Sequence, residues 1–139
     1  MPIVLAGAEI ALPKGYSLNE YRIEGTLGVG GFGLTYLALD SNLNLRVAIK
    51  EFLPGELVLR CENQSVKPKS ESTADIFKWG LMRFLDESRT LASFRHPNIV
   101  RVMRFFEANE TAYMVMEFVA GQPLNDWIGG RRPLAERAV

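Results

Sequence analysis

The chain has 139 residues, of which 47% are hydrophobic, so it is long enough for one domain with its own core. Sixteen basic and sixteen acidic residues cancel, and the net charge therefore indicates neither a nucleic-acid nor a membrane partner. The single cysteine, Cys61, excludes an internal disulfide framework and fits a reducing compartment. Residues 1–15 are apolar but contain Glu9 and no early positive charge, so they make a poor signal peptide. We expect a cytoplasmic chain.

Strand-like segments lie on both sides of one long helical segment. Short connections join the first three, which predicts an antiparallel meander. The sequence STAD at Ser72–Asp75 resembles a capping box and begins a helical pattern over residues 76–94, which HPNIV ends. A short helix is expected near 124–128. The order predicts an α+β fold with a five-stranded antiparallel sheet and one long helix. The expected strands cover residues 21–28, 34–40, 45–52, 102–107 and 112–119.

The sequence GVGGFGLTYLAL begins at Gly28 and places three glycines in the pattern G-x-G-x-x-G. Dinucleotide-binding folds and protein kinases share this pattern. A dinucleotide fold needs a helix after the last glycine and an acidic residue about 20 positions further on, which Glu51 could supply. However, LTYLALDSNLN predicts a strand and a turn, which argues against that fold. A glycine hairpin covering a polyphosphate remains, beside the simpler alternative of a turn that serves only the chain's geometry.

Four motifs in order carry a resemblance that covers residues 16–139. They are LGVGGFGLTY, VAIK at Val47–Lys50, HPNIV at His96–Val100, and YMVMEFVAG at Tyr113–Gly121. Together they resemble the N-terminal lobe of a protein kinase, most like bacterial Ser/Thr kinases of the eukaryotic type. The resemblance implies an N-terminal extension at 1–15 and a kinase N-lobe at 16–120. It also implies a hinge exit and the start of a truncated second lobe at 121–139.

A pair between Lys50 and Glu87 can be argued from the residues. A 3,4 spacing along the helix puts Glu87 in an apolar seam, where a carboxylate is costly unless a cation pairs with it. Lys50, on a mostly apolar strand, is the candidate cation. The alternative makes Lys50 a solvent-facing strand residue and Glu87 a charge at the edge of the seam that contacts Arg83. The seam is expected to contain Phe77, Gly80, Phe84, Glu87, Leu91 and Phe94.

The resemblance also implies a cofactor, ATP with Mg²⁺, and a set of binding residues. Lys50 and Glu87 would form the catalytic ion pair that aligns the phosphates. Thr35, where the family usually has valine, and Ala48 would lie above the adenine; Met116 would be the gatekeeper. Glu117 and Val119 would offer main-chain groups to the adenine edge. No metal ligand is assigned to this chain. The implied ATP-binding residues are Leu27, Gly28, Gly30, Gly31, Phe32, Gly33, Thr35, Ala48, Lys50, Met116, Glu117 and Val119.

Two departures from the family pattern shape the expected function. The spacing from Lys50 to Glu87 is 37 residues, which reflects an irregular insertion at 53–72 with room for a short hairpin. It is either a docking element beside the helix or, slightly favoured, a solvated elaboration. No HRD, DFG or APE motif occurs in the 139 residues. We therefore expect a fragment of a longer Ser/Thr kinase with protein substrates, itself inactive and weak in ATP binding.

The missing lobe predicts self-association of the fragment. Truncation is expected to expose apolar residues such as Leu91, Met116, Leu124 and Trp127, and large exposed apolar patches are rare on soluble monomers. The alternative function is a stand-alone or pseudokinase-like N-lobe that binds a partner without catalysis. The intact glycine pattern, Lys50 and Glu87 favour the kinase, because a pure scaffold does not need all three.

Overall fold

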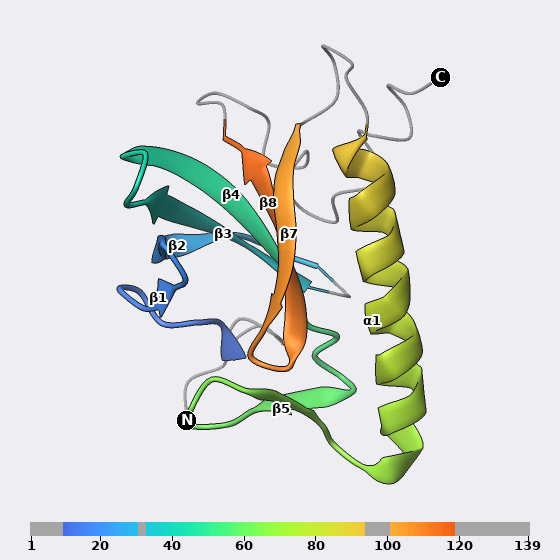
Figure 1. The fold of residues 1–139 in the computed structure, drawn as a ribbon. Coiled ribbons are helices and arrows are strands. Elements are labelled where there is room, and N and C mark those ends of the chain that lie inside the picture. Colours follow the sequence, from blue (N-terminus) through green and yellow to red (C-terminus); the bar gives the residue numbers. More distant parts are fainter. Residues whose placement is uncertain (1–9, 31–32, 94–100, 119–139) are drawn as a thin grey trace.

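A computed structural model describes residues 10–30, 33–93 and 101–118. Six strands in these ranges form one antiparallel sheet in the order β1-β2-β3-β4-β8-β7 (Figure 1). The α+β class is confirmed, and the strand beyond the expected five is β1, whose two residues are too few to show an alternating pattern. The strands are β1 (Ser17–Leu18), β2 (Tyr21–Val29), β3 (Gly33–Asp40), β4 (Leu45–Phe52), β7 (Val102–Ala108) and β8 (Thr111–Glu117).

Tight turns make the predicted meander. Between β3 and β4, the Asp40 carboxylate accepts hydrogen bonds from the backbone N–H groups of Asn42 and Leu43, at 2.9 and 3.0 Å. Between β7 and β8, Asn109 and Glu110 both have positive φ, 52° and 60°, as a two-residue hairpin turn requires. Strand β8 returns beside β4, which places β4 in the interior of the sheet.

The long helix α1 (Glu71–Ala92) packs beside β7, also contacts β8 and β6, and reaches β4 through the Phe52 side chain (Figure 1). The Phe52 ring lies 5.5 Å from that of Phe77 and 5.6 Å from that of Phe84, between centroids. A Cβ on Gly80 would come within 2.7 Å of the Phe52 ring, so this glycine lets the helix approach closely. The helix begins before the expected STAD, because Ser70 is the N-cap and its backbone N–H donates to the Thr73 hydroxyl at 3.1 Å.

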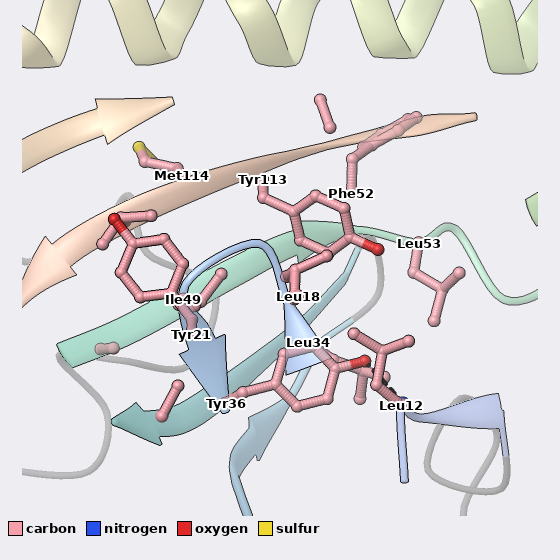
Figure 2. Packing of buried hydrophobic residues seen from close by; sticks show 14 of the residues in the cluster. Leu12, Leu18, Tyr21, Leu34, Tyr36, Ile49, Phe52, Leu53, Tyr113 and Met114 are labelled. Carbon is pink, nitrogen blue, oxygen red and sulfur yellow. Dashed lines mark hydrogen bonds between the residues drawn. The ribbon is translucent and has the colours of Figure 1, made fainter. Parts of the chain in front are cut away.

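The insertion forms the anticipated hairpin, with strands β5 (Val58–Arg60) and β6 (Val66–Pro68). The favoured interpretation of the insertion as a solvated elaboration is wrong. Leu53, Val58 and Val66 are each at most 2% exposed and belong to the main core. The last part of the N-terminal extension also joins this core through Leu12, which lies near Tyr36 and Leu53 in Figure 2.

The helix α1 ends at Ala92, with Ser93 as its C-cap, two residues before the expected end at Phe94. Phe94 itself, HPNIV and the short helix expected near 124–128 lie outside the described residues. Across the described ranges, no helix has both the length and the apolar character needed to cross a membrane.

Candidate nucleotide-binding site

The strand register brings the predicted site residues onto one face of the sheet. Gly28 pairs with Thr35, Thr35 with Lys50, and Ala48 with Met116. Residues directly opposite each other in antiparallel strands share a face, and so do alternate residues along one strand. Ala48, Lys50 and Phe52 alternate along β4 and therefore lie on this same face. Because the Phe52 ring contacts Phe77 and Phe84 of α1, this is also the face on which α1 packs.

The glycine segment joins strand to strand, as the sequence predicts. Gly33 begins β3 rather than a helix, so the dinucleotide-binding alternative is excluded for this segment. The Gly30 backbone N–H donates to the Gly33 carbonyl at 2.8 Å, which closes the hairpin. Gly31 and Phe32, at its tip, lie outside the described residues.

Gly33 has a steric role that can be read from its neighbours. A Cβ placed on it would lie 2.2 Å from the backbone carbonyl oxygen of Glu51, its near neighbour on β4. No side chain fits there without moving the two strands apart. The last glycine of the pattern is therefore required by the sheet, whatever ligand the hairpin meets.

We expect Gly33→Ala to lower the free energy of unfolding by about 1–3 kcal/mol, because the added methyl group overpacks two backbone segments. The matched control is Gly25→Ala on β2, where an added Cβ meets nothing within 4 Å. That variant should be unchanged or slightly more stable, since alanine restricts the unfolded chain. Urea denaturation of both variants makes the comparison, and equal midpoints would contradict the steric role of Gly33.

Lys50 and Glu87 lie on the same side of the sheet but in different environments. Lys50 is 9% exposed, so the alternative of a solvent-facing lysine is wrong. Glu87 is exposed, and the helix buries Ser88 instead, together with Phe77 and Phe84. Among the described positions, the expected seam is thus wrong at one: it continues from Phe84 by four residues to Ser88 rather than by three to Glu87. The small Ser88 hydroxyl donates to the Phe84 carbonyl at 2.8 Å.

The ion pairs formed between described residues do not include one between Lys50 and Glu87. The suggested contact between Glu87 and Arg83 is not among them either; the Arg83 guanidinium lies over the Trp79 ring instead. The pairing of Lys50 with Glu87 therefore stays a prediction. The pairing requires α1, which carries Glu87, to lie on the face of β4 that carries Lys50. The structure meets this requirement, since Phe52 on that face contacts α1.

The residues assigned to adenine are mostly buried. Ala48 is fully buried, while Thr35 and Met116 are 2% and 5% exposed. Met116 therefore cannot contribute to the exposed apolar patch anticipated from the sequence.

The other expected site residues differ in their exposure. Leu27 is half-buried and packs against the core, whereas Glu117 is exposed at the end of β8. Val119, Leu124 and Trp127 lie outside the described residues.

The opposite face of β4 holds a buried polar cluster that the sequence analysis did not identify. Glu51 is fully buried and accepts hydrogen bonds from the hydroxyl groups of Tyr36 on β3 and Tyr113 on β8. Arg60 on β5 makes an ion pair with Glu51 at 2.7 Å and also donates to the carbonyls of Ile10 and Gln64. Glu51, which has the spacing of the acidic residue in a dinucleotide-binding fold, is thus an anchor for the insertion.

Burial and the Glu51 carboxylate raise the pKa of Tyr36 and of Tyr113 well above its ordinary value, so both remain protonated donors. Burial lowers the pKa of Arg60, but its hydrogen bond to Glu51 and the charge of that carboxylate outweigh this effect and raise it. The cluster is therefore one buried charge pair with two neutral hydroxyl donors.

The protein kinase domain family matches residues 21–139, and the chain belongs to this family. It is 34% identical over 112 residues to the serine/threonine-protein kinase PknA of Mycobacterium tuberculosis (strain ATCC 25618 / H37Rv). This match covers 77% of the chain and 22% of PknA. It is 31% identical over 123 residues to PknG of Mycolicibacterium smegmatis, covering 85% of the chain and 14% of PknG. The chain thus spans less than a quarter of these curated relatives.

Solved structures agree with this family. The apo form of PpkA-294 superposes with a TM-score of 0.78 at 41% identity, over 84% of this chain and 41% of that one. The PknI kinase domain of Mycobacterium tuberculosis gives a TM-score of 0.53 at 22% identity, over 78% of this chain and 37% of that one, and shows the fold alone. The expected protein-kinase N-lobe is confirmed.

Proposed function

We propose that the chain is the ATP-binding lobe of a Ser/Thr protein kinase, which in a longer protein transfers the γ-phosphate of ATP to protein hydroxyl groups. The observation that carries this proposal is the single sheet face shared by Gly28, Thr35, Ala48, Lys50 and Met116. A nearly buried cation beside a glycine hairpin suits a polyphosphate, and the flanking small and apolar side chains suit a flat base.

Each residue has a definite task in this proposal. The glycine hairpin offers backbone N–H groups to the phosphates, and Lys50 holds their charge from the sheet. Ala48 leaves room above the adenine because its side chain is one methyl group, while Met116 closes the back of the site. Glu87 orients Lys50 when α1 turns its carboxylate inward. Bound ATP supplies the phosphoryl group, with Mg²⁺ offsetting its charge.

The test measures transfer of radiolabelled phosphate from ATP to protein. A longer protein that contains this chain and a following catalytic lobe should label serine or threonine. The 139-residue chain alone should not, because it contains no HRD or DFG motif to supply a base and metal ligands. Labelling by the isolated chain would refute this division of roles, and a longer protein that labels nothing would favour the pseudokinase-like module.

We also propose a cytoplasmic location for the chain. The single Cys61 suggests a reducing compartment, which supports this location.

A further inference from the structure

The side of α1 that faces away from the sheet carries three large exposed apolar side chains. Ile76, Trp79 and Met82 are 54%, 64% and 57% exposed. Asp75 and Arg83, also exposed, lie among them. At 100° per residue, these five positions span about a third of the helix circumference, opposite the buried Phe77, Phe84 and Ser88. We call these five residues the outer face of α1.

Single exposed apolar residues are common on proteins, but a stripe on one element is not. Within the described ranges, the other large exposed apolar residues are Leu43, Leu45 and Leu59, which lie on a turn and on strands β4 and β5. Within the described ranges, Figure 1 shows α1 at the side of the sheet with no other element against its far side. The Arg83 guanidinium lies 5.2 Å from the centre of the Trp79 ring, so the outer face of α1 itself carries a positive charge.

The outer face is complementary to itself when two helices run antiparallel. A two-fold axis at Trp79 places each residue opposite the one equally distant on the other side of Trp79. Ile76 then meets Met82, and the acidic Asp75 meets the basic Arg83. Each contact occurs twice, with the two Trp79 rings at the centre. We propose that the outer face of α1 is the docking site for a second copy of this chain, in a crossed antiparallel helix pair.

This interface differs from the self-association surface expected from the sequence. That surface was expected to include Leu91, Met116, Leu124 and Trp127. Met116 is 5% exposed, and Leu124 and Trp127 lie outside the described residues. The outer face lies on the opposite side of α1 from the buried residues that contact the sheet. The proposal depends on no nucleotide, so it can fail while the ATP-binding proposal holds, and the reverse is also true.

Sedimentation equilibrium of the 139-residue chain, from about 5 to 500 μM, tests the pairing in the range where small interfaces associate. The wild type should shift from monomer to dimer, and Trp79→Ala should stay monomeric, because it removes both central rings. Asp75→Arg or Arg83→Asp should each weaken the dimer about tenfold, because two like-charge contacts replace two attractive ones. The double variant D75R/R83D should return to within about threefold of the wild type, because the charges match again.

The matched control is Leu43→Ala, which removes a side chain 61% exposed on a different surface and should leave dimerisation unchanged. Circular dichroism checks that every variant is folded. A wild type that stays monomeric overturns the proposal and leaves the outer face to a different partner. A dimer insensitive to Trp79→Ala, or a double variant that recovers nothing, also overturns it, because the contact or its antiparallel register is then different.

Discussion

Replacing Arg60 by methionine should lower the free energy of unfolding by about 3–5 kcal/mol, because it leaves the Glu51 carboxylate buried without its cation. The Arg60 side chain is 6% exposed and that of Glu51 is fully buried, so water cannot replace the lost partner. Domains of this size are typically stable by about 5–15 kcal/mol, so the loss is a large fraction of the total. Urea denaturation followed by circular dichroism measures it.

A double-mutant cycle with Glu51→Gln separates the ion pair from simple loss of packing. Glutamine keeps an acceptor for the tyrosine hydroxyls but carries no charge. The double variant E51Q/R60M should therefore lose less stability than the sum of the single changes, by about 1–3 kcal/mol. Lys67→Met breaks an exposed ion pair, with Glu110, and should leave the midpoint nearly unchanged. Additive effects of the Glu51 and Arg60 changes would contradict an anchor built on their charges.

Replacing Lys50 by methionine in the longer kinase is expected to reduce phosphate transfer by at least about 10²–10³-fold, because the lysine charge acts on the phosphates in a site largely closed to water. Methionine keeps most of the aliphatic volume of a side chain that is 9% exposed, so the fold should persist. The measurement is the initial rate of phosphate transfer at saturating ATP, with circular dichroism as the check on folding.

Two further variants make the Lys50 result specific. Lys69→Met removes an exposed lysine near the start of α1 and should leave the rate unchanged. Glu87→Gln should also slow the reaction. Combining it with Lys50→Met should add little, because the two residues act as one pair in the active arrangement. A fully active Lys50→Met enzyme would remove Lys50 from the mechanism.

Local patterns were enough to predict the five longer strands of the main sheet and the glycine hairpin, but not the two-residue strand β1. Strands β2, β3 and β4 alternate or are β-prone, and turn residues separate them. The buried seam of α1 was harder to predict from the sequence. A spacing of three or four residues allows either Glu87 or Ser88 to follow Phe84 in the seam. The structure buries the serine, whose hydroxyl is satisfied within its own helix, and leaves the carboxylate in water.

The Glu51 cluster could not be predicted because its partners are distant in the sequence. Arg60, Tyr36 and Tyr113 lie 9, 15 and 62 positions from Glu51. Nothing in the insertion distinguishes Arg60 from a surface arginine until the hairpin folds back on the sheet. The same long-range packing explains why the insertion belongs to the core although it has few hydrophobic residues in a regular pattern.

The most direct test of the ATP-binding role is a ¹⁵N NMR titration of this chain with Mg²⁺–ATP, which detects even millimolar binding. The backbone signals of Gly28, Gly30, Thr35, Ala48, Lys50 and Glu117 are expected to shift together with one affinity, and Lys50→Met is expected to weaken that affinity. Signals of Arg60 and Tyr113, on the other face, should move little. Shifts concentrated on that other face, or none at the glycine hairpin and β4, would contradict the account.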